Sequence, residues 1–415
     1  MESTSKSADN LVIDSNEAVE FKLIREASDI NNDSLIFKPV MSHQIFGAQE
    51  TIFGYKNLKV SIYFSAAQLN PYLNISYSEK VDPKNYNSVE ADNIHGILTE
   101  KLEIKFNQNL DEFINSLDKE VKFKPPGELK ETFTIEDEDP NSIDGAIRER
   151  EFELYYCEVT TPGLIKYHQR LQTFILWYID AASFIDTDDE KWKFFLLFEK
   201  YKMDGEMMYA IAGYATVYEY YAYPVNIRPR ISQMLVLPPF QRRGLGAALL
   251  SGIYNHYRLI KNVTDITVED PSEDFQMVRD YVDCKNCMEL KSFQPESLWS
   301  NGFTPEMVRE AAETFKINKR QARRIYEILK LRTVKKENEN QYKQYRIEVK
   351  RRLNLPNQNE QNKLKKLEAY MSPQEISEIK AAFVLSDGQR LSSLDKSYRE
   401  LESIYERVIN RLDEN

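Results

Sequence analysis

A short segment combines glycine and arginine in a pattern that can hold a diphosphate. The sequence Gln241-Arg242-Arg243-Gly244-Leu245-Gly246-Ala247 follows an apolar stretch and leads into a helical pattern. Its glycines permit unusual dihedral angles and a close approach of the backbone to a ligand. The N–H groups at the start of a helix point at one spot, with the positive end of the helix dipole behind them. Because Arg242 and Arg243 add cationic donors, the segment predicts a pyrophosphate cradle.

Two other phosphate-binding motifs are excluded at this segment. No Gly-Lys-Ser/Thr triplet follows the glycines, which excludes a P-loop, and the G-x-G-x-x-G pattern of dinucleotide-binding folds is absent. An ordinary glycine turn before a helix remains the alternative for the motif taken alone.

Strands and helices must position this cradle, and the hydrophobic pattern predicts where they lie. Buried strands are predicted over 192–198, 207–221, 231–237 and 263–268, with a helix over 244–259 and another within 164–180. Short strands, among them 58–64 and 102–106, and a short helix over 109–117 are predicted upstream. After Pro271 the period becomes helical, and helices are predicted over 305–315, 320–331, 342–353, 360–371, 373–383 and 391–412.

These elements predict a mixed α/β (α+β) fold, with a strand-rich part before the cradle and helices after it. We divide the chain into five parts. They are a flexible tail (1–20), an N-terminal α+β domain (21–130), a ligand-binding catalytic core (131–272), a C-terminal helical domain (273–335) and a helical extension (336–415). The extension is rich in Lys, Glu, Asn and Gln, a composition that allows mobility.

Composition and charge narrow the class of protein and of partner. The 415 residues include 42% hydrophobic residues, which argues against a mainly disordered chain. The polar, acidic start and the lack of a long apolar run argue against secretion and membrane spanning, and three cysteines cannot form a disulfide scaffold. Residues 301–415 hold 24 Lys+Arg and 18 Asp+Glu, a balance of +6. Since the whole chain has a formal net charge of −11, residues 1–300 carry −17. An acidic front part repels nucleic acid and favours a basic peptide substrate, with solubility alone as the alternative.

The cradle segment also carries a resemblance to a known family. A strand followed by Q/R-x-x-G-x-G/A resembles the pyrophosphate-binding motif of the GNAT acetyltransferase superfamily, whose cofactor is acetyl-CoA. Three further segments, together with the strand that leads into the motif, resemble type B histone acetyltransferase catalytic subunits in the right order between about residues 40 and 290. These stretches are Phe46 to Lys56, Tyr218 to Pro224, Arg228 to Val236 and Asp265 to Ser272.

The resemblance implies a fold, an activity and partners. The fold is a GNAT acyl-CoA N-acyltransferase core with a β-rich N-terminal domain and a helical C-terminal part. The activity is transfer of acetyl from acetyl-CoA to lysines of the newly synthesised histone H4 tail, in nucleus and cytoplasm. The partner is a WD-repeat histone-binding protein of the retinoblastoma-binding type. An acetyltransferase for another protein amine and a non-catalytic histone-binding chaperone remain alternatives.

Residue roles follow from the chemistry together with the resemblance. A lysine is almost wholly protonated at pH 7, so a base must take its proton. Glu269 ends a predicted strand, and the resemblance assigns it as the general base, with Asp270 and Asp180 as further carboxylates; a solvated strand end is the alternative. The family carries Glu at the position of Asp180, which puts the role of this shorter side chain in question. The expected cofactor contacts are Met234, Leu235, Val236, Gln241, Arg242, Arg243, Gly244, Leu245, Gly246, Ala247 and Ser272.

The same resemblance predicts a peptide groove. Its expected lining is Ala48, Gln49, Glu50, Tyr218, Glu219 and Tyr220. Carboxylates there suit tail Lys or Arg, and tyrosine faces can receive cations. A β-rich core of amphipathic rings is the alternative for the tyrosines.

Two other signals favour simpler explanations. Cys284 and Cys287 form a C-x-x-C without a second pair of metal ligands, so we expect no metal. The basic run over 319–324 follows a short turn, as in DNA-reading helices, but a solvated helix face fits the acidic front part better.

Overall fold

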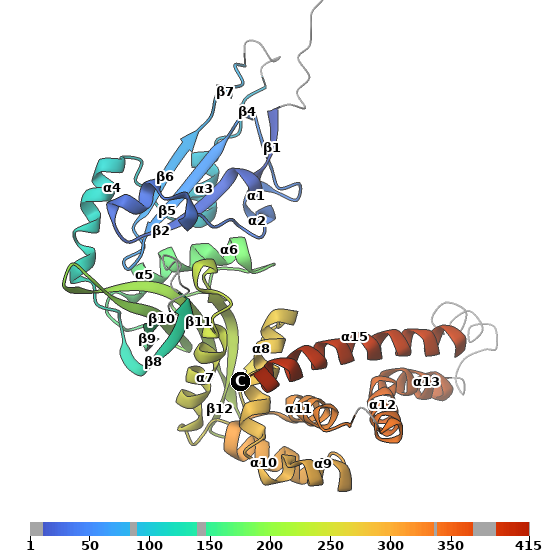
Figure 1. Ribbon diagram of the computed structural model, residues 1–415. Helices are drawn as coiled ribbons and strands as arrows, with labels where there is room; N and C mark the ends of the chain where they lie inside the picture. Colours follow the sequence, from blue (N-terminus) through green and yellow to red (C-terminus); the bar gives the residue numbers. More distant parts are fainter. Residues whose placement is uncertain (1–10, 84–88, 139–146, 336–337, 368–386, 415) are drawn as a thin grey trace, which may run out of the picture. The chain divides into compact units, whose positions relative to one another are not determined.

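A computed structural model describes residues 11–83, 89–138, 147–335, 338–367 and 387–414. It forms two compact units (Figure 1). The first unit comprises the chain up to Tyr221 together with Pro229–His256, and the second comprises Ala222–Arg228 and Tyr257–Asn415.

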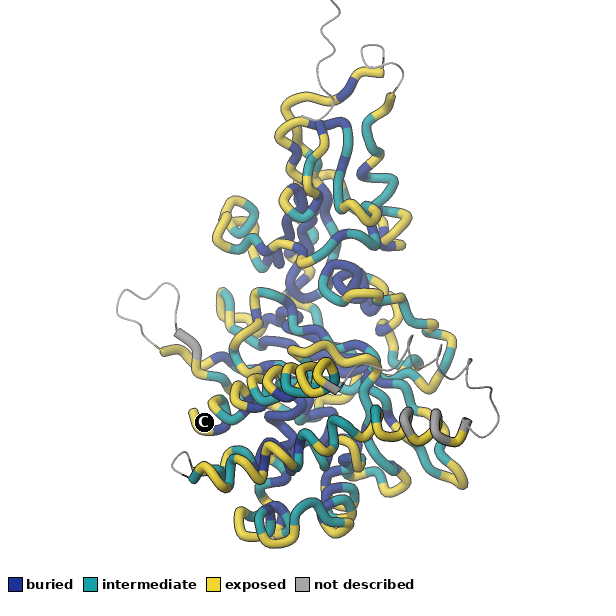
Figure 2. Tube along the Cα trace, turned by 90° about the vertical axis from the view of Figure 1, so that its right-hand side faces the viewer, coloured by how far each residue is buried: buried dark blue, intermediate teal, exposed yellow. Residues whose placement is uncertain are grey.

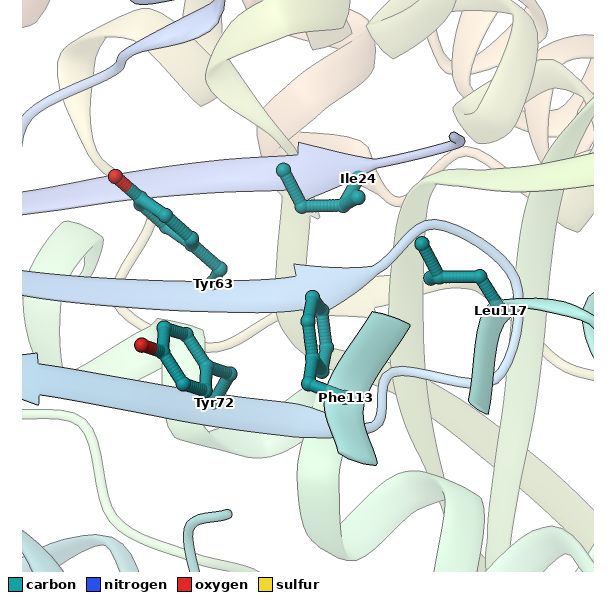
Figure 3. Close-up of a cluster of buried hydrophobic side chains, with 5 residues drawn as sticks. All are labelled: Ile24, Tyr63, Tyr72, Phe113 and Leu117. Carbon is teal, nitrogen blue, oxygen red and sulfur yellow. The ribbon is translucent and has the colours of Figure 1, made fainter. Parts of the chain in front are cut away.

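The N-terminal part of the first unit is built on a small sheet. Strand β5 (Lys59–Ser65) runs parallel to β2 (Val19–Ile24) and antiparallel to β6 (Pro71–Ser76). Side chains from this sheet and from α4 (Leu110–Leu117) form a buried cluster, in which the rings of Tyr72 and Phe113 stack with their centroids 5.3 Å apart (Figure 3). The remaining elements of this part are β1 (Val12–Asp14), α1 (Ser15–Ala18), α2 (His43–Phe46), β3 (Thr51–Phe53), β4 (Tyr55–Lys56), β7 (Glu79–Lys80) and α3 (Ile94–Leu102).

Part of the predicted flexible tail is ordered. Strand β1 pairs antiparallel with β3, and helix α1 follows it directly. The backbone N–H and hydroxyl of Ser15 both donate to the carbonyl of Glu50, at 2.8 and 2.7 Å. These long-range bonds hold residues 11–20 in place, and they have no counterpart in the local sequence pattern.

A larger sheet lies mostly in the first unit. Five of its strands follow the order β12-β11-β10-β9-β8, and the pairs β8–β9, β9–β10 and β10–β11 are antiparallel. The bounds are β8 (Glu128–Glu138), β9 (Ile147–Glu158), β10 (Trp192–Met203), β11 (Glu206–Ala222) and β12 (Asn226–Val236). Phe194 to Phe198 of β10 are all buried, as expected for a strand covered on both faces.

Helices accompany this sheet where the sequence predicts them. The stretch after β9 forms α5 (Leu164–Leu171), a 3₁₀ turn (Gln172–Phe174) and α6 (Ile175–Tyr178), and the stretch after β12 forms α7 (Leu245–Arg258). Gly252 lets α7 pack tightly, because an added Cβ would lie 2.1 Å from a methyl carbon of Leu154 in β9.

The second unit is helical apart from short β pairing. Ile227 and Val263 form a parallel bridge, and β13 (Thr267–Val268) covers only the end of the strand predicted over 263–268. The helices are α8 (Glu273–Cys287), α9 (Pro295–Ser300), α10 (Pro305–Phe315), α11 (Lys319–Arg332), α12 (Glu339–Leu353), α13 (Leu355–Leu367) and α15 (Asp387–Glu414). The helix predicted over 373–383 lies outside the described residues.

Helix α15 belongs to the core of the second unit and contacts α8, α11 and α12. Its buried residues Tyr398, Tyr405, Val408 and Leu412 fall on one face, while its other described side chains are half-buried or exposed (Figure 2). The carboxylate of Glu327, in α11, accepts hydrogen bonds from Arg352 of α12 and Tyr405 of α15. One buried anion therefore joins three helices.

The expected mixed α/β fold with a β-rich N-terminal part and a helical C-terminal part is confirmed. The basic run over 319–324 is only partly solvated, because Arg323 pairs with Glu327 and Arg324 pairs with Asp280. No helix among the described residues is long and apolar enough to cross a membrane.

Candidate active site

The predicted cradle forms the turn between β12 and α7. A 3₁₀ turn (Pro238–Phe240) follows the strand, and the buried ring of Phe240 anchors it. The side-chain amide of Gln241 donates to the carbonyl of Val236 at 2.8 Å and ties the loop to the strand end. Arg242 and Gly244 both adopt positive φ angles, +64° and +81°. This left-handed geometry turns successive N–H groups toward one side, as in anion-binding nests.

The N–H groups at the start of α7 are available to a ligand. The carbonyl of Gly244 accepts from Ala247 and Ala248, at 3.0 and 3.1 Å, so the helical bonding begins there. Within the described ranges, the N–H groups of Gly244, Leu245 and Gly246 have no hydrogen-bond partner. A Cβ added to Gly244 would meet no atom within 4 Å, so the space above the turn is open. These residues fit a diphosphate.

The strand that leads into the cradle lies very close to its neighbour. Leu235 is buried, while Met234 and Val236 are half-buried. A Cβ on Gly213 of β11 would lie 2.7 Å from the carbonyl oxygen of Leu235 and 3.0 Å from Cα of Val236. Only glycine permits this approach, and the sequence analysis did not single out Gly213 because its partner is 22 positions away.

The predicted carboxylates divide between the two units. Asp180 lies in the first unit, whereas Glu269 and Asp270 follow β13 in the second and are exposed. Asp270 has φ +31°. The hydroxyl of Ser272 accepts a hydrogen bond from the N–H of Phe275, so this residue caps α8.

Asp180 meets a histidine that the sequence analysis missed. Nε2 of His43 lies 3.1 Å from Oδ1 of Asp180, and Nδ1 of the same ring lies 3.6 Å from Oε1 of Glu50. The structure therefore brings together one predicted catalytic carboxylate and one predicted substrate-binding carboxylate through a single imidazole.

Glu50 has more internal partners than a substrate-binding role requires. Its carboxylate accepts hydrogen bonds from the N–H groups of Ser42 and His43 and from the side-chain amide of Asn16. The Ser42 hydrogen bond is the largest of the effects that hold the pKa of Glu50 below its usual value. Ala48 and Gln49 lie in the same turn and are exposed.

Two glutamines hold the loop that carries Asp180. The side-chain amide of Gln44 donates to the carbonyl of Ala182 at 2.7 Å, and that of Gln233 donates to the carbonyl of Ser183 at 2.8 Å. Gln233 directly precedes Met234 in β12. The loop over 180–183 is thereby fixed beside the strand expected to hold the cofactor.

The predicted tyrosines form an aromatic cluster with acidic and basic neighbours. The hydroxyl of Tyr218 donates to Asp189 at 2.7 Å, and its ring packs against Trp192 and Tyr220. The hydrogen bond to Asp189 raises the pKa of Tyr218. The guanidinium of Arg230 lies 4.7 Å from the ring centre of Tyr220, so this face already receives a cation. Glu219 is half-buried.

In the part of the chain that the structure describes, no group of three or more His, Cys, Asp or Glu side chains is placed to hold a metal ion. Cys284 and Cys287 are both buried on α8.

Comparison with known proteins decides the family. Residues 11–180 match the family model described as Histone acetyl transferase HAT1 N-terminus, and residues 279–331 match Histone acetyltransferase type B catalytic subunit, C-terminal. The human histone acetyltransferase type B catalytic subunit is 42% identical over 397 residues, which cover 96% of this chain and 92% of the human protein.

This chain belongs to the family of histone acetyltransferase type B catalytic subunits. The resemblance seen in the sequence is confirmed, and the chain is an acetyltransferase. A family member from Dictyostelium discoideum is 34% identical over 391 residues, which cover 88% of this chain and 81% of that protein.

One solved structure that matches is an aminoglycoside acetyltransferase from an uncultured soil metagenomic sample, in complex with sisomicin. The match covers 31% of this chain and 83% of the aminoglycoside acetyltransferase chain. It has 17% identity and a TM-score of 0.23, values too low to inform on the site.

Proposed function

We propose that this acetyltransferase transfers acetyl from acetyl-CoA to lysine side chains of the newly synthesised histone H4 tail. The observation that carries the proposal is the set of partnerless N–H groups of Gly244, Leu245 and Gly246 at the start of α7. A diphosphate is the ligand that such a turn suits best, and CoA is a diphosphate-containing acyl carrier. The family membership supports the same chemistry.

Each part of the cofactor has residues to receive it. The turn over 241–247 holds the diphosphate, with Arg242 and Arg243 as cationic donors. The backbone of Met234, Leu235 and Val236 holds the pantetheine arm, and Ser272 is a further contact. Acetyl-CoA, when bound, supplies an activated acetyl thioester. We also propose the division of the chain into the five parts that the sequence predicts.

Glu269 takes the proton from the substrate ammonium in this proposal. It is exposed near a strand end, where a peptide has access. We assign Asp270 and Asp180 to the catalytic carboxylates as well, where their negative charge favours the cationic lysine at the reacting centre.

The lysine amine attacks the acetyl thioester directly, without an acyl-enzyme, so that a C–N bond replaces the C–S bond and CoA leaves as its thiol. The structure supports this because Cys157, Cys284 and Cys287 are all buried. Burial raises the pKa of Cys157 to about 12 and raises those of Cys284 and Cys287 well above their ordinary value. A protonated thiol is a poor nucleophile.

The acidic front part suits a basic histone tail. We assign Ala48, Gln49, Glu50, Tyr218, Glu219 and Tyr220 to the peptide groove. A WD-repeat histone-binding protein of the retinoblastoma-binding type is the proposed partner, and the nucleus and cytoplasm are the proposed locations.

Substitution of Glu269 tests the base. Glu269→Gln is expected to lower turnover at least tenfold, because the amide cannot accept the proton, and to leave acetyl-CoA affinity nearly intact. The measurement is the initial rate of radiolabelled acetyl transfer from acetyl-CoA to a histone H4 tail peptide, together with cofactor binding by calorimetry. Asp274→Asn is the matched control, since Asp274 is also exposed and lies nearby in α8. Unchanged turnover would remove Glu269 from the mechanism.

The same assay identifies the acceptor. Label on the tail peptide but not on a version with blocked lysines supports lysine transfer. Equal label on both peptides indicates another amine, and binding without turnover indicates a chaperone.

A further inference from the structure

The loop that carries Asp180 is held by three side chains with different roles. Gln44 and Gln233 bind its main chain, at the carbonyls of Ala182 and Ser183. Among the residues that the structure describes, only His43 reaches the side chain of Asp180, with 3.1 Å between Nε2 and Oδ1. The main-chain tethers fix where the loop lies, but they leave the Asp180 carboxylate free to rotate. His43 is therefore the contact that selects its orientation.

His43 is itself fixed from the opposite side. Its backbone N–H donates to Oε1 of Glu50 at 3.0 Å, and its Nδ1 lies 3.6 Å from the same oxygen. Glu50 is in turn bound by the N–H of Ser42 and the amide of Asn16. Glu50 therefore holds His43 in place, and the imidazole of His43 in turn holds the Asp180 carboxylate.

The helices behind this pair are packed together. His43 opens α2, and Asp180 follows α6 by two residues. The ring of Phe46 in α2 packs against Trp177 in α6, with 6.3 Å between centroids, and the N–H groups of Val40 and Met41 donate to the carbonyl of Trp177. The imidazole and the carboxylate therefore start from backbones that are fixed relative to each other.

We infer that His43 is a positioning residue, which holds the Asp180 carboxylate in one orientation beside the acetyl-transfer site. This inference rests on the proposed function, in which Asp180 belongs to the catalytic carboxylates. A role in stability alone explains the contact poorly. The Asp180 side chain is 76% exposed, and exposed ion pairs contribute little to stability. Catalytic groups, in contrast, must be held within a fraction of an ångström.

Two substitutions of similar size separate positioning from packing. His43→Leu fills the space without a polar atom, and His43→Gln keeps a side-chain donor that can reach Asp180. With the full chain, saturating acetyl-CoA and a varied concentration of histone tail peptide, we expect His43→Leu to lower kcat about fivefold to tenfold. The KM for acetyl-CoA, measured separately at a saturating concentration of the tail peptide, should not change, and His43→Gln should recover most of the lost kcat. His95→Leu is the control, since His95 is half-buried and lies on α3, a different element.

A double-mutant cycle identifies the residue through which His43 acts. Asp180→Asn should lower kcat by about tenfold, and adding His43→Leu to it should cause no further loss. An equal additional loss in the double variant would overturn the inference, and so would a His43→Gln variant as slow as His43→Leu. An unchanged kcat for Asp180→Asn would overturn it as well.

Thermal unfolding of every variant is measured alongside. We expect melting temperatures within about 2 °C of the unsubstituted chain, and a loss of kcat that tracks a falling melting temperature would also overturn the inference. Absence of acetyl transfer by the unsubstituted chain would instead contradict the proposed function. The two failures are therefore distinguishable.

Discussion

His168 shows how one buried side chain makes folding sensitive to acid. It is fully buried on α5, packs against the rings of Phe194 and Tyr214, and neither ring nitrogen has a hydrogen-bond partner among the described residues. Burial lowers the pKa of His168 to about 3. The unfolded chain takes up this proton near pH 6.5, whereas the folded chain resists it until about pH 3. Acidification through this range therefore favours unfolding.

We expect His168→Leu to flatten this pH dependence. The unsubstituted chain should lose roughly 1.4 kcal/mol of unfolding free energy for each pH unit below about 6 through this residue. The leucine variant lacks that contribution and should be as stable at pH 7, because an apolar side chain of similar size replaces unsatisfied polar atoms. Urea unfolding at pH 7 and pH 5 measures both effects.

A second histidine, His256, also makes stability depend on pH. Burial lowers the pKa of His256 to about 4, so it contributes in the same direction and remains in the variant. A His168→Leu variant that loses stability on acidification as steeply as the unsubstituted chain would contradict the assignment.

At the scale of elements, a substitution in the turn before α7 should have two separate effects, one on stability through backbone strain and one on ligand binding. Gly244 adopts φ +81°, and an added Cβ meets no atom within 4 Å. Gly244→Ala should therefore cost about 1 kcal/mol of stability through its left-handed backbone. It should also weaken CoA binding severalfold, because the methyl group occupies space beside the N–H groups of the cradle.

Gly163, at the start of α5, is a close match for this test. Its φ is +80°, and a Cβ there also meets nothing within 4 Å. Gly163→Ala should lose similar stability and bind CoA normally, as measured by calorimetry and thermal unfolding. Equal weakening of CoA binding in both variants would show that strain, and not the cradle, governs affinity.

The elements also show what the sequence could and could not predict. Strands β10 and β11, helix α7 and the cradle were predictable because they depend on local periodicity and on glycines next to a helix. The strand expected over 102–106 was wrong, since α3 runs to Leu102 and residues 103–106 form no strand, and β8 and β9 were not predicted. The contact of His43 with Asp180 was not, because it joins residues 137 positions apart. The same holds for Glu327, whose partners Arg352 and Tyr405 lie on other helices. Tertiary packing decides such contacts, and no local pattern encodes them.

At the scale of the whole molecule, the uneven charge predicts a salt effect. Residues 1–300 carry a formal −17 and residues 301–415 carry +6. If a basic tail is the substrate, its attraction to the acidic front part is screened by salt. The KM for a histone tail peptide should rise about threefold to tenfold between about 0.05 M and 0.3 M salt.

A peptide of equal length with neutral residues in place of some lysines and arginines is the control. Its KM should respond less to salt, as measured by initial rates at saturating acetyl-CoA. The same response for both peptides would argue that charge does not attract the substrate.

Alkylation of the buried cysteines can measure local opening of the structure. Cys157 lies in the first unit, and Cys284 and Cys287 lie in the second. An alkylating reagent can reach these sulfur atoms only after the surrounding packing has opened. The rate at which each cysteine-containing peptide gains mass therefore measures how often each unit opens locally, without any added probe.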